Sequence, residues 1–149
     1  MRRDFYFSRK PPRLFQNNSE YFLTFNSFNG LRLNYQARQI VFDSIIYLTK
    51  KLKLELFSFV IMLDHVHILV GCQAAKDISV LLQRMKSYTS HKIKGMCKID
   101  TPVWRLGTYD RVVRNDRELI EFENYIIYNP VKAGYVDEPE KWEHLYVAK

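Results

Sequence analysis

Two apolar runs separated by only two residues constrain the fold of this chain most strongly. Residues 55–62 (ELFSFVIM) and 65–70 (HVHILV) each have the length and composition of a buried strand. Leu63 and Asp64 between them predict a tight turn, and Gly71 is expected to end the second strand. The two runs therefore predict an antiparallel hairpin, which is a stiff platform for side chains.

The second of these strands carries two histidines. Side chains alternate along a strand, so His65, His67 and Leu69 are expected on one face and the intervening apolar residues on the other, toward a core. Two neutral imidazoles at this spacing can bind one divalent cation. For an isolated pair, two partly buried histidines held by hydrogen bonds are the simpler explanation, because two ligands do not complete a metal site.

The segments around the hairpin predict the other elements of the fold. In chain order we expect a strand over 21–28 closed by a turn at Asn29-Gly30, a helix over 34–53, the hairpin, a helix over 77–94 capped by Gly95, an interrupted strand or loop over 102–113, and a last helix after Asn115. This order predicts an α+β fold, a ferredoxin-like or RRM-like sandwich. Its antiparallel sheet would have about four to five strands, with helices packed on one face.

The last helix has the clearest start signal, because Asn115 can cap it and Glu118 completes a capping-box pattern. Pro130 is expected to end the helix, which would leave Asn129 at a frayed end. Tyr125 and Asn129 are four residues apart and therefore share a helix face. Their line borders the apolar stripe of this helix, so Tyr125 is expected at the seam between helix and sheet. The stripe consists of Leu119, Phe122 and Ile126.

Length and charge limit the organisation and the partners of the chain. Its 149 residues fit a single domain over 1–149, with a basic N-terminal arm (1–18) and a tail of uncertain structure (137–149). The net charge of +7 and the pI near 9.4 favour a polyanionic partner, most often nucleic acid. No apolar run approaches the roughly 18 residues of a membrane span. Cys72 and Cys97 suggest neither a disulfide framework nor a zinc ribbon, so a reducing cytoplasm is expected.

Together these residues suit phosphodiester chemistry. An oriented tyrosine hydroxyl can attack a phosphodiester when Mg²⁺ or Mn²⁺ polarises the phosphate. Two imidazoles and an amide oxygen would leave open metal positions for the phosphate and for water. Tyr125 alone is more typical of a half-buried packing residue. Its combination with Asn129, the histidine pair and the basic charge favours the functional interpretation.

Two segments, in this order along the chain, carry a specific resemblance. Residues 62–70 (MLDHVHILV) and 125–134 (YIIYNPVKAG) resemble the histidine–hydrophobe–histidine strand and the catalytic helix with its exit turn of the single-tyrosine HUH transposases, the IS200-like transposases. The resemblance is strongest to the REP-associated branch. Residues 84–87 and 104–114 support it, so that it covers most of residues 21–136.

The resemblance implies a role for each of the residues singled out above. His65, His67 and Asn129 would be metal ligands for Mg²⁺ or Mn²⁺, and Tyr125 would be the nucleophile. The implied activity is that of a single-stranded DNA endonuclease and strand transferase, a site-specific nickase and ligase. It would act at hairpin-forming repeats through a covalent 5′-phosphotyrosine intermediate. The protein would be a monomer or homodimer in the bacterial cytoplasm, associated with the nucleoid and with no membrane partner.

The chain departs from the family at two places. The turn before the histidines is usually Pro-Asn, and here Asp64 is expected either to add a carboxylate behind the metal ligands or simply to make the turn. The N-terminal arm lacks the usual arrangement of base-reading residues. Contacts to DNA are expected from basic residues in the arm, in the middle helix and ahead of the last helix: Arg13, Arg84, Lys86, Lys92, Arg105, Arg111 and Arg114.

Three alternatives remain beside this interpretation. Tyr128 is a competing nucleophile, although the helical period rotates it by roughly 60° from the Tyr125–Asn129 line. Nucleotide hydrolases with three alternating histidines are disfavoured because Leu69 holds the third position. A catalytically silent module that binds single-stranded DNA or RNA could use the same fold, but the histidine strand has no aromatic residue on which a base could stack.

Overall fold

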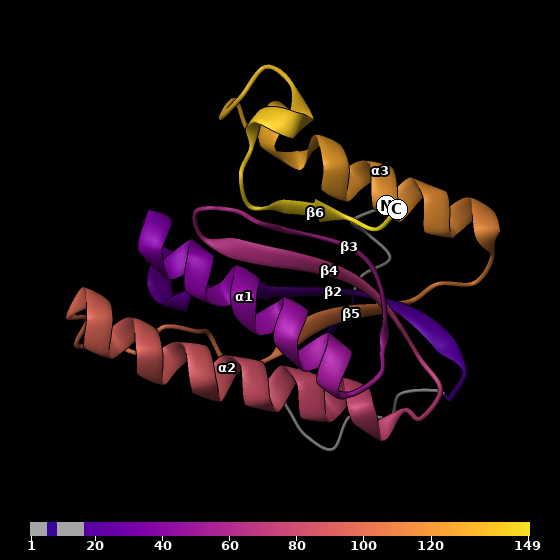
Figure 1. Ribbon diagram of the computed structural model, residues 1–149, viewed down its shortest axis with the longest axis horizontal. Coiled ribbons are helices and arrows are strands. Elements are labelled where there is room, and N and C mark those ends of the chain that lie inside the picture. The colour runs from indigo at the N-terminus through magenta and orange to yellow at the C-terminus, as the bar shows by residue number, and fades with distance from the viewer. Residues whose placement is uncertain (1–5, 9–16) are drawn as a thin grey trace.

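The chain folds into one antiparallel sheet with helices on both faces (Figure 1). The computed structural model describes residues 6–8 and 17–149. Its elements are β1 (Tyr6–Ser8), β2 (Ser19–Asn26), η2 (Phe28–Gly30), α1 (Tyr35–Lys51), β3 (Glu55–Ile61), β4 (His65–Cys72), α2 (Lys76–Cys97), β5 (Thr108–Val112), α3 (Asp116–Lys132), η3 (Pro139–Lys141) and β6 (Leu145–Val147).

The strand order is β1-β5-β2-β4-β3-β6, and every pair is antiparallel. The inner strands β5, β2, β4 and β3 are the fourth, first, third and second strands of a β-α-β-β-α-β unit, which is the ferredoxin-like arrangement. The predicted α+β fold is therefore confirmed. The predicted four to five strands become six, because β1 and β6 add three-residue edges that are too short to show alternation in the sequence.

The helices do not all lie on one face, so that part of the prediction is wrong for α3. Figure 1 shows α1 and α2 on one side of the sheet and α3 on the other. The reason lies in the central strands, which are apolar on both faces. Leu23 and Phe25 of β2 pack under α1 and α2, while Phe22 packs under α3. A sheet that is buried on both faces needs cover on both.

Helix α3 is attached by a small apolar cluster of its own. Phe122 and Ile126 are fully buried against Phe22 and Leu69. Burying each of these two helix side chains contributes roughly 1.5–3 kcal/mol. The predicted apolar stripe therefore does face the sheet, and it fixes which side of α3 lies over β3 and β4.

The end of α3 differs from the prediction. Pro130 lies inside the helix, which continues to Lys132. The proline removes one backbone donor near the C-terminus, but Ala133 N still donates to Asn129 O at 2.9 Å. Gly134, with φ of 81°, then ends the helix in the left-handed region. Asn129 is consequently buried within regular helix instead of lying at a frayed end.

The ends of α2 and β4 also differ from the sequence prediction. Helix α2 passes through Gly95, and Lys98, with φ of 53°, takes the left-handed capping position instead. Strand β4 continues past Gly71 to Cys72. The cap of α3 is confirmed, since Asn115 Oδ1 accepts from Glu118 N at 2.9 Å. Glu118 Oε1, however, accepts from Arg114 N rather than from the cap residue.

Residues 137–149, expected as a tail of uncertain structure, are packed onto the sheet. Strand β6 pairs with β3, and Trp142 Nε1 donates to Ile61 O at 2.9 Å. His144 is 1% exposed and accepts from Arg38 Nε at its Nδ1. The tail therefore belongs to the fold. Within the described ranges, no helix combines the length and the apolarity that crossing a bilayer requires.

Candidate metal and nucleophile site

The two histidines lie together on the α3 face of the sheet, as predicted. The β2–β4 register places Asn26 opposite His65 and Thr24 opposite His67. The two imidazole centroids are 4.8 Å apart, with an interplanar angle of 74°. His67 is 4% exposed, while the side chain of His65 is 25% exposed. The strand therefore provides one buried and one accessible imidazole.

Each histidine has a partner at Nδ1. Asp64 Oδ1 lies 2.7 Å from His65 Nδ1, and an ionised carboxylate only accepts, so Nδ1 carries a proton and, in the neutral ring, Nε2 has the lone pair. Thr24 Oγ1 lies 2.7 Å from His67 Nδ1 and can either donate or accept. When Nδ1 of His67 donates to Thr24, both histidines present an Nε2 lone pair.

His67 is held neutral. Burial, and then the repulsion that a second proton would meet from a protonated His65, keep the pKa of His67 well below its usual value. Its Nε2 is buried and has no hydrogen-bond partner among the described residues. A neutral ring with an unpartnered nitrogen and an oriented second nitrogen is the arrangement that metal-bound histidines use.

The residues present fit a sparsely liganded divalent cation. Within residues 17–149, no three His, Cys, Asp or Glu side chains form a cluster that could hold a metal. Asn129, 9% exposed on α3, offers an amide oxygen. Asp64 contacts His65 at Nδ1, and its supporting role behind a metal ligand stays a prediction.

Tyr125 is brought against this pair by α3. Its ring centroid lies 5.3 Å from that of His67, with an interplanar angle of 70°, and the tyrosine is half-buried. Tyr128 is 56% exposed and makes no ring contact with either histidine within residues 17–149. The geometry therefore favours Tyr125 over Tyr128 as the residue that can act beside the histidines.

Phe22 and Thr24 support the site and were missed in the sequence. Phe22 stacks on His67 at 5.2 Å and on Phe122 at 4.6 Å, and its ring edge meets Tyr125 at 5.9 Å. The available signal was the alternation in residues 21–26, which puts positions 22, 24 and 26 on one strand face. Only the β2–β4 register shows that this face is the one bearing the histidines.

Two of the basic residues expected at DNA hold β5 to α3. Arg111 is 7% exposed, donates to Glu118 Oε2 at 2.7 Å and lies over the ring of Phe122. Arg114 donates to the same oxygen at 2.7 Å. The hydrogen bond from the Arg114 side chain contributes most, and together these contacts keep the pKa of Glu118 below its usual value. Arg111 thus has a structural role whatever else it does.

The other basic residues are distributed over the molecule. Lys86 Nζ donates to Gly107 O at 2.8 Å and so fastens the segment before β5 to α2. Arg84 and Lys92 line a groove of about 1070 Å³ between α1 and α2, on the sheet face opposite the histidines. Arg105 lines a smaller pocket together with Asp64. Arg13 lies outside the described residues, and contact with DNA remains a prediction for all seven.

Comparison with known proteins identifies similar proteins that are named as transposases. A Haemophilus influenzae protein named as a REP-associated tyrosine transposase is 24% identical over 100 residues, which cover 60% of this chain and 57% of that protein. The structure of a REP-associated tyrosine transposase bound to a REP hairpin aligns with a TM-score of 0.76 at 21% identity, over 91% of this chain and 81% of the other. A transposase structure from Deinococcus radiodurans aligns with a TM-score of 0.56 at 18% identity, over 78% of this chain and 95% of the other.

The family assignment rests on a match to a family profile. The profile of the family described as "Transposase IS200 like" matches residues 31–126, which is more than half of the chain and includes both histidines and Tyr125. With the ferredoxin-like order of the inner strands, this confirms the resemblance seen in residues 62–70 and 125–134. The chain belongs to the IS200-like transposase family.

Proposed function

We propose that the protein is a metal-dependent single-stranded DNA endonuclease and strand transferase that acts at hairpin-bearing sites. The observation that carries the proposal is the contact of Tyr125 with His67, a buried, neutral imidazole whose Nε2 has no partner among the described residues. One structural neighbour is named as bound to a REP hairpin, which supports hairpin DNA as the substrate class.

The chain offers ligands for a divalent cation, Mg²⁺ or Mn²⁺. His65 and His67 would bind it through Nε2 and Asn129 through its amide oxygen, while Asp64 and Thr24 fix the two rings. When bound, the cation withdraws charge from the non-bridging oxygens of the scissile phosphate. The two imidazoles are neutral ligands and add no negative charge that would repel the DNA.

Tyr125 would supply the nucleophile. Its oxygen forms a bond to phosphorus as the P–O3′ bond breaks. The tyrosine proton passes to water and the leaving 3′-oxygen takes one from water, so no proton is gained or lost overall. The 5′ end stays on the tyrosine, and a later attack by a 3′-hydroxyl releases it by the reverse exchange. The ring of Phe22 contacts both His67 and Tyr125 and is itself stacked on Phe122, so little orientation has to be achieved during the reaction.

The test is a covalent adduct. With Mn²⁺ and a 3′-end-labelled single-stranded hairpin oligonucleotide, the wild-type chain should give a labelled protein–DNA band that survives denaturing electrophoresis. Tyr125→Phe should remove that band and retain DNA binding, because only the hydroxyl is lost. Tyr128→Phe is the matched control and should leave the adduct.

Two results would contradict the proposal. An adduct that persists in Tyr125→Phe would mean that another residue is the nucleophile. Hairpin binding with no adduct in either Mg²⁺ or Mn²⁺ would instead support a catalytically silent nucleic-acid-binding module on the same fold.

A further inference from the structure

A polar pocket of about 390 Å³ lies beside the accessible histidine and is not used by the chemistry above. Three segments form it: the end of β2 with the following η2 turn, the turn between β3 and β4, and the segment before β5. The lining residues are Asn26, Ser27, Asn29, Gly30, Asp64 and Arg105. Asn26 is directly opposite His65 in the β2–β4 ladder, and Asp64 contacts the His65 ring, so pocket and histidine share a wall.

Backbone hydrogen bonds hold the three segments together. Ser27 N donates to Asp64 O at 2.9 Å, and Arg105 N donates to Asn26 O at 2.9 Å. Ser27 also forms an isolated antiparallel bridge with Trp104, which is buried. The walls are therefore fixed before a ligand arrives, which lowers the entropic cost of binding.

The chemistry of the lining is mixed in a specific way. Arg105 is a donor only and Asp64 an acceptor only, while the amides of Asn26 and Asn29 both donate and accept. The hydroxyl of Ser27 is buried and has no hydrogen-bond partner within the described residues. A carboxylate in the wall disfavours a phosphate, so the lining suits a neutral planar group with donors and acceptors on its edges.

Nucleobases have such edges, and guanine matches best. Its O6 and N7 are adjacent acceptors for a guanidinium. Its N1–H and N2–H₂ are adjacent donors that can face a carboxylate, and no other DNA base has both pairs. Asp64 Oδ1 already accepts from His65, which leaves Oδ2 for a ligand.

We propose that this pocket binds one unpaired base of the DNA strand that crosses the histidine pair, with guanine preferred. The inference rests on the proposed function, because a scissile phosphate at His65 places a neighbouring nucleotide at the pocket. Asp64, as an acceptor for N1–H and N2–H₂, gives the pocket its preference for guanine. Arg105 acts there as a specificity-determining residue.

Binding of two oligonucleotides tests the inference. Fluorescence anisotropy with Mn²⁺ measures the affinity of the full chain carrying Tyr125→Phe, which binds without cleaving. The probes are an all-thymidine octamer and the same octamer with one central guanine. Because the strand can slide to place that base, we expect the guanine octamer to bind about tenfold more tightly, as one bidentate contact gives.

The variants separate this pocket from general charge. Arg105→Ala and Asp64→Asn, both at exposed positions, should each bring the two affinities together. Arg84→Ala removes the same charge from the opposite face and should keep the ratio. The inference would be overturned if the Tyr125→Phe chain bound the two octamers with equal affinity. It would also be overturned if the guanine preference survived Arg105→Ala or Asp64→Asn.

This result is independent of the adduct test. A guanine preference without any adduct would keep the pocket and reject the proposed nuclease. An adduct without a guanine preference would keep the nuclease and reject the pocket.

Discussion

His67 is the residue on which the site depends most. An unpartnered buried polar group costs about 1–3 kcal/mol, and Nε2 of His67 is such a group among the described residues. Its ring is nevertheless fixed by Thr24 on one side and by the stack of Phe22 on the other. An oriented ring with an unpartnered nitrogen is what the proposed metal-binding role of His67 requires.

The protonation of two buried histidines makes stability depend on pH. Burial lowers the pKa of His67, with a further contribution from His65, and burial followed by Arg38 lowers the pKa of His144. Both are neutral in the fold and gain a proton more readily when unfolded. Their contribution is fully present above the usual value of about 6.5 and is lost as pH falls below it.

We therefore expect a lower melting temperature at pH about 5 than at about 7.5, on either side of that value. His144→Gln should reduce the difference between the two pH values, because one of the groups no longer titrates. His91→Gln, at an exposed position of α2, is the control and should preserve the difference. A difference unchanged by His144→Gln would show that His144 does not set the acid sensitivity.

At the residue scale, the sequence predicted what local periodicity controls. Alternation along one strand placed His65 and His67 together, and the helical repeat placed Tyr125 near Asn129. Phe22 and Thr24 could not be assigned to the site in this way. Their positions depend on the pairing of β2 with β4, which is a contact between distant segments.

At the element scale, α3 shows where a strong local rule was overridden. Pro130 was expected to end the helix, but it is buried, and the turn after it is closed by Tyr135 N donating to Pro130 O at 3.0 Å. Tertiary packing and this C-terminal turn offset the cost of one missing donor. The continued helix keeps Asn129 on the face that also carries Tyr125.

Substitution of two glycines by alanine, one in the last turn of α2 and one just after α3, should change the free energy of unfolding in opposite directions. Gly134 has φ of 81° and nothing within 4 Å of an added Cβ, so Gly134→Ala meets only backbone strain and should destabilise by about 1 kcal/mol. Gly95 lies inside α2, also with open space, so Gly95→Ala should stabilise by about 0.5–1 kcal/mol. Urea unfolding midpoints of the two variants measure both; a stabilising Gly134→Ala would contradict the left-handed cap.

At the scale of the whole molecule, the arrangement of the inner strands was predictable and the edges were not. The β-α-β-β-α-β pattern determines the order of four strands, whereas β1 and β6 have three residues each and depend on pairing alone. The net charge likewise predicted only part of the interaction. The net charge predicted a polyanionic partner but not which face would meet it, and Arg84 and Lys92 proved to lie opposite the histidines.

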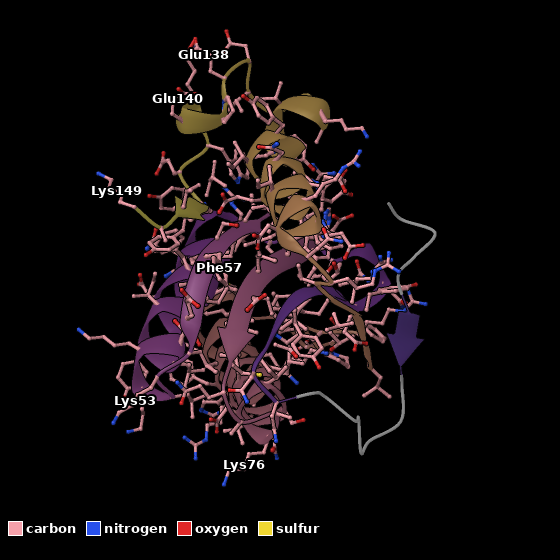
Figure 2. The ribbon with its side chains drawn as sticks, turned by 90° about the vertical axis from the view of Figure 1, so that its right-hand side faces the viewer. Lys53, Phe57, Lys76, Glu138, Glu140 and Lys149 are labelled. Carbon is pink, nitrogen blue, oxygen red and sulfur yellow. The ribbon has the colours of Figure 1, made fainter. Side chains whose placement is uncertain are left out.

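Charge also differs between the ends of the molecule. Figure 2 shows Lys53 and Lys76 at one end and Glu138 and Glu140 at the other. The acidic end follows the C-terminus of α3. A DNA backbone that reaches Tyr125 is therefore expected to approach along the sheet from the β2 and β5 side and to avoid that end.

The site is assembled within one chain, and this gives the last prediction. His65 and His67 come from β4 and Tyr125 from α3 of the same molecule, with the Tyr125 and His67 rings 5.3 Å apart. A mixture of His65→Ala and Tyr125→Phe chains should therefore form no DNA adduct, since neither chain holds a complete set. Each variant should first be shown to melt like the wild type. The two variants are made with different lengths, so that a gel shows which chain carries the DNA. An adduct on the His65→Ala chain in the mixture would mean that α3 serves the histidines of a second copy.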